Sequence, residues 1–221
     1  FDFEHFGDNV NDLKKTLSGE FGKKLLSAKK PLIIIGSGVA ELEDAQAIYK
    51  TVGEFVAKQS NFNTPEWNGF NLLHREASRT AALDLGVSSG SNSESKPKFI
   101  YLLGADELHN KDIPKDAFVV YQGHHGDKGA SYADVVLPGS AYTEKSATYV
   151  NTEGRSQSTR AATNPPGVAR EDWKIIRALS EYVGHALPYS DIYSIRDRLS
   201  QIAPHLVRHD VIEPVSPEIA A

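Results

Sequence analysis

Short, continuous apolar runs alternate with helical patterns along the chain. Apolar runs lie at 32–35, 99–103 and 118–121, and a further short strand is expected over 134–137, where three apolar residues follow Asp134. Each is four or five residues long and is bounded by proline, glycine or polar residues. Runs of this kind are typical of strands that are buried on both faces, as in a parallel sheet.

Between the strands, apolar residues recur at helical spacing and predict a series of helices. These cover about 41–58, 70–83 and 170–183, with a last helix that starts from a Ser190 or Asp191 cap and runs to about Ile202. Leu13 and Leu17 predict a further short helix. Strands that alternate with helices predict an α/β fold, with a doubly wound, largely parallel sheet of four to five strands and helices on both faces. The crossovers are expected to be right-handed.

The same pattern predicts the domain organisation. Residues 1–203 are expected to form one α/β domain, interrupted near 86–98 by a loop rich in Ser, Gly, Asn and Lys, which we expect to be flexible. The tail at 204–221 contains Pro214 and Pro217 and is expected to be extended.

The amino-acid composition argues against several classes of function. The net charge of −5 argues against nucleic-acid binding, which normally needs a basic patch. No apolar run approaches the roughly 20 residues that span a bilayer. The chain has no cysteine, which excludes disulfides, thiolate metal sites and cysteine-ligated iron–sulfur clusters within these residues. It also has no methionine, so we expect it to be a piece of a longer or processed product.

A glycine-rich turn, Gly36-Ser37-Gly38, follows the first strand. A dinucleotide-binding fingerprint needs a third glycine or alanine that Glu41 replaces, and Glu54, the acid at the usual distance, falls within a predicted helix. We therefore favour an ordinary strand-to-helix turn over a nucleotide site.

His124 and His125, with Asp127, suggest a metal site. Adjacent side chains in an extended loop are expected to point apart, and no third ligand lies at the usual spacing. A glycine-rich loop at the end of a strand is the favoured interpretation.

Charged residues outside this loop also favour structural roles. Glu144-Lys145 and Glu153-Gly154-Arg155 offer an acid–base pair, but an ion-pair network that braces a loop is favoured. His74, Arg75 and Arg79 fall on the predicted helix 70–83, where a solvated or interface role is expected. No nucleophile elbow, P-loop, HExxH or EF-hand pattern is present.

One stretch resembles a known family. Residues 133–157, which end in Asn151-Thr152-Glu153-Gly154-Arg155-Ser156-Gln157, resemble a signature of the molybdopterin oxidoreductase superfamily. With Gly123-His124-His125-Gly126-Asp127 and the stretch 169–180, the chain is similar to the large iron–sulfur (75 kDa) subunits of respiratory complex I. The likeness is strongest over 121–180 and covers roughly 1–208. The superfamily's Gly-Thr before the Asn motif is Ala147-Thr148 here.

The resemblance implies a scaffold role. Members of the complex I family are expected to retain the pterin-binding fold without its cofactor, and their iron–sulfur clusters belong to an N-terminal part outside these residues. The resemblance thus implies a non-catalytic domain of NADH:ubiquinone oxidoreductase that supports electron transfer. Its partners would be other subunits of the peripheral arm, on the matrix side of the mitochondrial inner membrane, with no nucleic acid and no direct membrane insertion. No catalytic, cofactor-binding or metal-binding residue is assigned.

Two alternatives remain at this point. The chain could be a fragment of an active molybdopterin-dependent oxidoreductase such as a formate dehydrogenase, which molybdenum or tungsten in the parent protein would support. It could also be a nucleotide-binding module that uses Gly36 to Gly38, which calorimetry with NADH and ATP would test.

Overall fold

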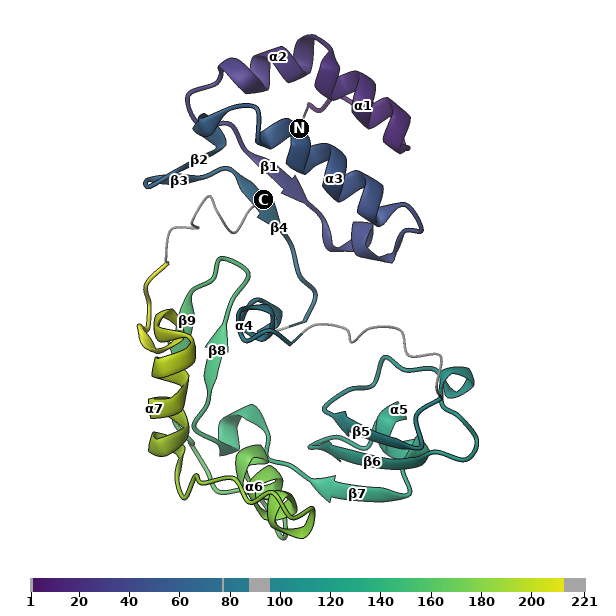
Figure 1. The fold of residues 1–221 in the computed structure, drawn as a ribbon, viewed down its shortest axis with the longest axis vertical. Helices are drawn as coiled ribbons and strands as arrows, with labels where there is room; N and C mark the ends of the chain where they lie inside the picture. Colours follow the sequence, from purple (N-terminus) through teal and green to yellow (C-terminus); the bar gives the residue numbers. More distant parts are fainter. Residues whose placement is uncertain (1, 77, 88–95, 213–221) are drawn as a thin grey trace. The chain divides into compact units, whose positions relative to one another are not determined.

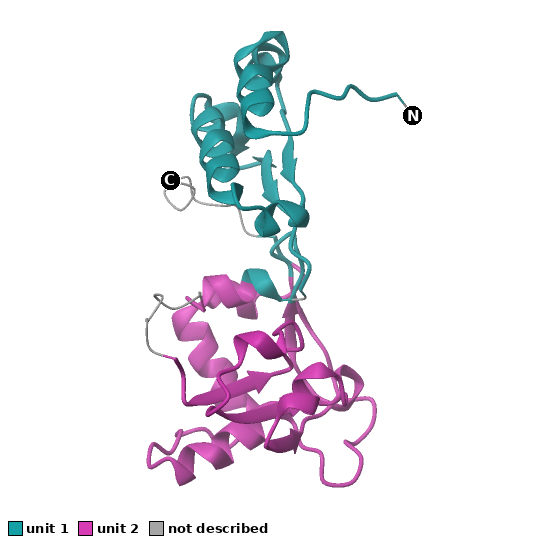
Figure 2. Ribbon diagram, turned by 90° about the vertical axis from the view of Figure 1, so that its right-hand side faces the viewer, with its two compact units in different colours: residues 1–80, 150–155, 211–221 teal, residues 81–149, 156–210 magenta. Residues whose placement is uncertain are grey.

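The structure of the protein, a computed structural model, describes residues 2–76, 78–87 and 96–212 (Figure 1). The chain forms two compact units. The first contains residues 1–80, 150–155 and 211–221, and the second contains 81–149 and 156–210 (Figure 2). The central residues of the loop expected at 86–98, and the end of the expected tail, lie outside the described residues.

The first unit packs helices around small sheets. Its helices are α1 (Val10–Ser18), α2 (Glu20–Ser27) and α3 (Ala45–Val56), with 3-10 helices η1 (Ser37–Glu41) and η2 (Ser60–Phe62). Its strands are β1 (Ile33–Ile35), β2 (Asn63–Thr64), β3 (Trp67–Asn68) and β4 (Phe70–Leu72). β1 and β4 are parallel, and β2 and β3 are antiparallel. The short helix α4 (Arg79–Asp84) crosses the boundary between the two units, which falls between residues 80 and 81.

The core of this unit forms where α3 meets β1. Its buried residues are Ile35, Val52, Phe55, Val56 and Phe62. Phe55 and Phe62 meet edge to face, with ring centroids 6.0 Å apart. α1 begins at Val10 because the Asn9 side chain accepts hydrogen bonds from the first free backbone N–H groups of the helix.

The second unit contains a three-stranded parallel sheet. Its strands are β5 (Phe99–Leu103), β6 (Phe118–Gly123) and β7 (Val135–Pro138), in the order β5-β6-β7. The short elements around them are η3 (Asn110–Asp112), α5 (Lys128–Tyr132) and η4 (Tyr142–Glu144). A two-stranded sheet, β8 (Thr148–Val150) and β9 (Ser156–Ser158), leads to α6 (Asp172–Tyr182), α7 (Ile192–Ile202) and η5 (Pro204–Val207).

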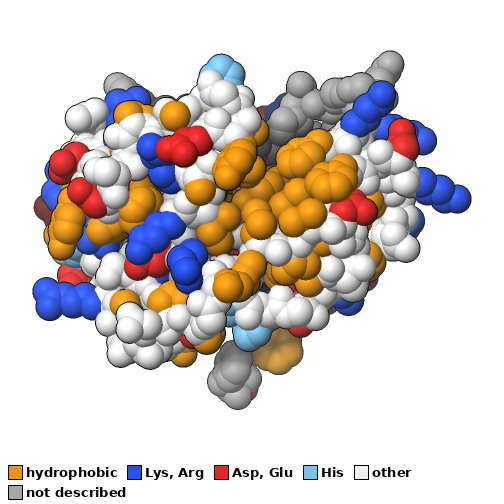
Figure 3. Space-filling view, turned by 90° about the horizontal axis from the view of Figure 1, so that it is seen from below, with side chains coloured by type: hydrophobic (Ala, Val, Ile, Leu, Met, Phe, Trp, Pro, Cys, Tyr) orange, Lys and Arg blue, Asp and Glu red, His pale blue; other side chains and the backbone are white. Residues whose placement is uncertain are grey.

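The three-stranded sheet buries one face well. Leu102, Val119 and Tyr121 form its core, against Ala130 and Ala133 in and beside α5. β7 lies towards the lower end of the unit in Figure 1, and Figure 3, which looks from below, shows hydrophobic side chains gathered there. Val135 and Val136 of this edge strand remain partly exposed.

The α/β class is confirmed, but the expected large sheet is not. The described residues form small parallel and antiparallel sheets, and no large doubly wound sheet is present among them. The strand order gives the physical reason. Because β5, β6 and β7 follow one another across the sheet in one direction, right-handed crossovers place both connections on the same face. A doubly wound sheet needs a reversal of direction, which these three strands do not contain.

The four expected strands and most helices are confirmed, but the helix expected over 70–83 is wrong. Phe70–Leu72 instead pairs with Ile33–Ile35 as a parallel strand, and α4 forms only from Arg79. The Ile33 N–H donates to the Gly69 carbonyl and the Leu73 N–H to the Ile35 carbonyl. Pairing with β1 therefore decides the conformation here, against the local helical pattern.

Candidate functional site: a pocket at the carboxyl ends of β6 and β7

A pocket of about 520 Å³ opens where β6 and β7 end. The carboxyl ends of parallel strands are where open α/β sheets usually bind ligands. The lining comes from the loop after β6, from α5, from the end of β7 and from the 166–169 segment. These residues are Gly123, His124, His125, Gly126, Ala130, Val136, Pro138, Gly139, Ala141, Glu144, Pro166, Val168 and Ala169.

Close packing around Tyr121 sets the shape of the loop after β6. Tyr121 is almost fully buried, and a Cβ on Gly123 would lie 2.4 Å from its hydroxyl. A Cβ on Gly129 would lie 2.5 Å from the Ala105 carbonyl oxygen. The Gly129 N–H donates to the Asp106 carboxylate at 2.7 Å, which ties the end of β5 to the start of α5. Burial raises the pKa of Tyr121, and the carboxylates of Asp106 and Asp127 add to this effect.

The two histidines of the pocket lining lie side by side. The ring centroids of His124 and His125 are 4.2 Å apart. The expectation that these side chains point apart is therefore wrong, because the turn with Gly123 and Gly126 is not an extended segment. Among the described residues, no group of three or more His, Asp or Glu side chains could hold a metal ion.

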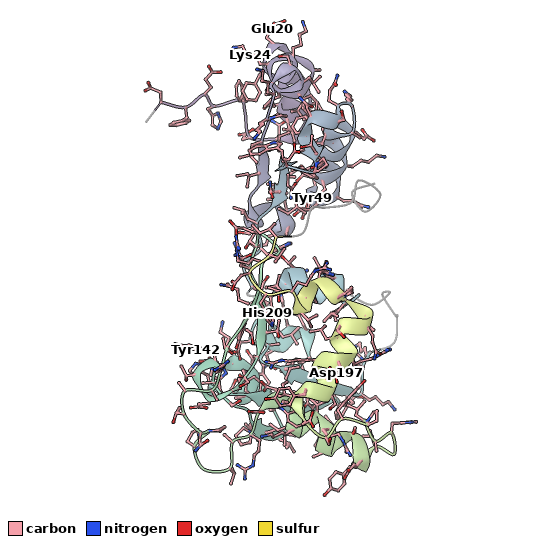
Figure 4. The ribbon with its side chains drawn as sticks, turned by 90° about the vertical axis from the view of Figure 1, so that its left-hand side faces the viewer. Glu20, Lys24, Tyr49, Tyr142, Asp197 and His209 are labelled. Atoms are coloured by element: carbon pink, nitrogen blue, oxygen red, sulfur yellow. The ribbon has the colours of Figure 1, made fainter. Side chains whose placement is uncertain are left out.

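Glu144, the acid in the pocket lining, hydrogen-bonds to the backbone of its own segment. Glu144 accepts a hydrogen bond from the Ala141 N–H at 2.9 Å and so caps η4. Tyr142 of η4 is 67% exposed and extends outward from the unit (Figure 4). Glu144 is therefore engaged with the backbone and is poorly suited to act as an acid or base.

Next to Gly139 of the pocket lining lies a cluster of four polar side chains, which we call the polar brace. Its members are Tyr101, Gln122, Lys145 and Asp172. Gln122 is fully buried; it accepts a hydrogen bond from the Tyr101 hydroxyl and donates to Asp172 Oδ1 at 2.9 Å. Lys145 Nζ lies 2.5 Å from Asp172 Oδ2. Burial raises the pKa of Tyr101, and Asp172 adds to this effect.

The polar brace joins β5, β6, the 145 loop and the first turn of α6. The sequence predicted an ion-pair network among Glu144-Lys145 and Glu153-Gly154-Arg155, but Lys145 pairs with a residue outside this set. Its partner is Asp172, 27 residues away, and Arg155 pairs with Glu153 at 3.6 Å on the surface. A Cβ on Gly139 would lie 2.7 Å from Asp172 Oδ1, so glycine there leaves room for the brace.

A serine–histidine pair was not predicted from the sequence. Ser156 Oγ lies 3.4 Å from His209 Nδ1, and Figure 4 labels His209. The Ser156 hydroxyl, however, donates to the Leu206 carbonyl at 2.5 Å and is 1% exposed. Because its proton is held by a carbonyl and substrate cannot reach it, this serine is not arranged as a nucleophile.

The glycine turn after β1 leads into η1, and α3 begins only at Ala45. Gly36 has φ −68°, and a Cβ on it would meet nothing within 4 Å. The interpretation as an ordinary turn is therefore supported, because no α-helix N-terminus follows Gly36 and Gly38 directly. Of the three residues expected on the helix 70–83, His74 and Arg75 precede α4 and Arg79 begins it. Arg75 pairs with Glu41 on the surface of the first unit.

The comparison with protein families decides the wider assignment. The model of the molybdopterin oxidoreductase family matches residues 1–182. The chain belongs to the molybdopterin oxidoreductase family. Curated relatives extend the match. The chain is 73% identical over 220 residues, all of this chain and 31% of the relative, to the mitochondrial NADH-ubiquinone oxidoreductase 78 kDa subunit of Candida albicans.

Two further relatives give the same picture. The Neurospora crassa 78 kDa subunit is 60% identical over 98% of this chain, and 29% of the relative is covered. The NADH dehydrogenase (ubiquinone) iron-sulfur protein 1 of Solanum tuberosum is 45% identical over 98% of this chain, with 30% of the relative covered. The resemblance seen in the sequence is confirmed, and the chain spans less than a third of the length of these relatives. Within the described residues, no helix is long and apolar enough to cross a membrane.

The family name implies a pterin cofactor, and the pocket residues do not fit one. Pterin cofactors of this kind carry phosphate, which proteins hold with cationic side chains or with clustered backbone N–H groups. Of the described residues that line the pocket, none is Lys or Arg, and the charged one is the acid Glu144. The acid Asp127 stands at the start of α5, where a phosphate would otherwise meet backbone N–H groups. The pocket therefore retains the position of a ligand site without the charges that such a ligand needs.

Proposed function

We propose that this chain is a non-catalytic scaffold domain of the large iron–sulfur subunit of NADH:ubiquinone oxidoreductase, complex I. The observation that carries the proposal is the 73% identity to a subunit of that name over the whole chain. In this role the domain supports electron transfer from NADH to ubiquinone by holding its neighbours in place. The iron–sulfur clusters belong to the parent subunit outside these residues.

The chemistry of the site supports a structural role. The described pocket lining offers two exposed histidines and one acid that is engaged with the backbone. The buried polar groups of the second unit are used to join elements, as in the polar brace. Catalytic sites normally hold acids, bases or nucleophiles that are available to a substrate. None of the residues discussed above is placed in that way.

The names of the relatives suggest the setting. We place the parent subunit on the matrix side of the mitochondrial inner membrane, in the peripheral arm of complex I, with other subunits of that arm as its partners. Complex I members from two fungi and a plant are similar to this chain over nearly all of its length, and their names include the mitochondrion.

A native gel of a mild-detergent membrane extract tests the proposal. An antibody to this chain should detect the very large band that stains for NADH dehydrogenase activity. A small band without that activity would overturn the assignment.

Two variants of the full-length subunit separate a scaffold from a catalytic role. Gly129→Ala should lower the amount of assembled enzyme, because its Cβ collides with the Ala105 carbonyl. The double variant His124→Ala, His125→Ala should leave the NADH oxidation rate of each assembled enzyme unchanged. A tenfold loss of rate in the histidine variant at normal assembly would mean that the pocket takes part in the reaction.

The family match favours one second candidate, a piece of an active molybdopterin-dependent oxidoreductase such as a formate dehydrogenase. Elemental analysis of the purified parent protein tests it. Molybdenum or tungsten near one atom per chain would support the active enzyme, and a protein without either metal would remove it.

A further inference from the structure

A second pocket, in the first unit, belongs to no site described above. It opens between α1, α2 and β1 and has a volume of about 300 Å³. All of its lining residues fall within 6–52, and none of them is charged. Its main apolar walls are formed by Leu13 and Leu17 of α1, Phe21 and Leu25 of α2, and Leu32 and Ile33 at β1. Because every one of these residues belongs to the first unit, the pocket is a property of that unit by itself.

The segment before α1 forms a fixed wall of this pocket. The ring of Phe6 contacts that of Phe21, with centroids 4.7 Å apart. Gly7 has φ +123°, and a Cβ on it would lie 2.3 Å from the Cβ of Asp12. The Asn9 side chain then caps the helix by accepting hydrogen bonds from its first backbone N–H groups. The contacts that begin α1 therefore also hold the Phe6 ring at the pocket.

The surface around the pocket is strongly basic, although the chain as a whole carries a net charge of −5. Residues 10–30 contain six lysines and only two acids, Asp12 and Glu20, each of which pairs with one lysine. The other four lysines form no ion pair within the described residues. All six are exposed, and Lys14 and Lys24 directly adjoin lining residues in α1 and α2. The first unit thus combines an uncharged apolar pocket with a cationic surround.

We propose that this pocket binds the alkyl chain of a fatty-acid anion, and that the surrounding lysines hold its carboxylate. Apolar cavities stay dry and bind apolar molecules; one of about 150 Å³ lined by Leu, Ile and Phe holds benzene. This pocket has about twice that volume. Each methylene that is buried strengthens binding roughly three- to fourfold. The carboxylate stays outside, because an unpaired charge is not stable in an apolar pocket, and there it meets the lysines.

The charge complementarity favours this ligand over a segment of the chain itself. The aromatic residue nearest in sequence to the pocket wall, Phe3, is 77% exposed and does not line the pocket. A fatty-acid anion combines the apolar chain and the negative charge that the site offers to bind. The inference goes beyond the proposed function and does not depend on it.

Three ligands with the same chain and different head groups test the proposal by calorimetry on the full-length subunit, below their micelle concentrations. Dodecanoate should bind with a Kd of roughly 10–100 µM. Dodecanol should bind about tenfold more weakly, and the dodecyltrimethylammonium cation at least about 30-fold more weakly. Raising the salt from about 0.05 to 0.5 M should weaken dodecanoate binding alone. Absence of dodecanoate binding, or equal affinity for the three ligands, would overturn the proposal.

A matched pair of tryptophan variants locates the ligand. Thr16→Trp places a large ring in the pocket lining, whereas Asn11→Trp adds the same ring at an exposed position of α1 that does not line the pocket. The first should weaken dodecanoate binding at least about tenfold, because it fills the space of the alkyl chain, and the second less than about twofold. Equal effects of the two variants would exclude this pocket as the binding site.

A pair of charge variants, which leave the pocket lining unchanged, tests the role of the lysines. Lys24→Gln with Lys29→Gln should weaken dodecanoate binding about fivefold and leave dodecanol binding unchanged. Lys111→Gln with Lys115→Gln removes two exposed charges from the second unit and should change neither affinity. Equal losses in the two double variants would contradict a local role of the cations around the pocket.

Photolabelling extends the test to the intact assembly. A dodecanoate analogue with a diazirine at the end of its chain should label residues within 6–33, and an excess of dodecanoate should prevent this labelling. An assembly in which these residues remain unlabelled would mean that a protein segment occupies the pocket, and the proposal would fail. If the labelled subunit does not migrate with NADH dehydrogenase, the proposed function fails while this inference stands.

Discussion

The ion pair of the polar brace gives a quantitative test of what holds α6 to the sheet. We consider Asp172→Asn, Lys145→Met and the double variant. Asp172→Asn preserves the size of the side chain and the oxygen that accepts from Gln122 at 2.9 Å, and it removes the charge that faces Lys145. Lys145→Met removes the cation and preserves most of the apolar stem.

The expected magnitude follows from burial. The Lys145 and Asp172 side chains are 20% and 28% exposed, so the pair lies between a surface and a buried ion pair. Exposed pairs contribute about 0–1 kcal/mol, and breaking a fully buried pair costs about 3–5 kcal/mol. We expect each single variant to lower the free energy of unfolding by about 2 kcal/mol. We expect the double variant to lose less than the sum, with a coupling energy of about 1–2 kcal/mol.

The two tryptophans make the assay specific to one unit. Trp67 belongs to the first unit, whereas Trp173 follows Asp172 directly in α6. In a Trp67→Phe background, fluorescence during urea unfolding reports on the second unit alone. Both single variants should shift the midpoint to lower urea with an unchanged slope. Single-variant losses and a coupling energy all below about 0.3 kcal/mol would refute the reasoning and mean that water screens the pair as it does on the surface.

Three further predictions concern other positions. Gly129→Ala should destabilise the second unit by about 1–3 kcal/mol in urea unfolding, whereas Gly36→Ala, where a Cβ meets nothing within 4 Å, should change the stability of the first unit by less than about 0.5 kcal/mol. Trp173→Ala should lower the free energy of unfolding by about 2 kcal/mol, measured by circular dichroism. This is less than the loss at a buried core tryptophan, because Trp173 is half-buried and its indole donates to Glu171. A loss above about 4 kcal/mol would contradict this reasoning. The raised pKa values of Tyr101 and Tyr121 show that folding favours the neutral phenols. The stability that these two tyrosines contribute is therefore fully present below pH 10, the ordinary pKa of tyrosine, and is lost as the pH rises through their higher pKa values in the folded state. Unfolding measured from pH 8 to 12 should show this loss, and Tyr101→Phe should reduce its steepness.

The strands that could be predicted from the sequence are those whose apolar runs are continuous. Phe99–Leu103 and Phe118–Gly123 lie in a parallel sheet, where both faces favour apolar residues, and the pattern is therefore unambiguous. Phe70–Leu72 is a strand only because β1 pairs with it, 37 residues earlier in the chain. A three-residue strand carries too little local pattern to compete with the helical spacing of Leu73, Ala77 and Ala81.

The site shows the same division between local and distant information. The loop Gly123-His124-His125-Gly126 was correctly predicted to follow a strand, because glycine and strand patterns are local. The pairing of Lys145 with Asp172 was not predicted, since the sequence offered nearer acids such as Glu144. Adjacent side chains rarely face each other, and the backbone N–H of Ala141 satisfies Glu144 instead. Only the three-dimensional arrangement distinguishes these partners.

The positions of the charges agree with the scaffold role that we propose for this chain. The carboxyl ends of β6 and β7 lie where a ligand would bind, and glycines there keep the backbone close. Lys145 pairs with Asp172 and is not among the residues that line the pocket. A cation that neutralises an internal carboxylate stabilises the fold, whereas the same cation in the pocket would favour an anionic ligand. The placement of Lys145 thus assigns this end of the sheet to holding α6 in position and leaves the pocket without an anchor for phosphate.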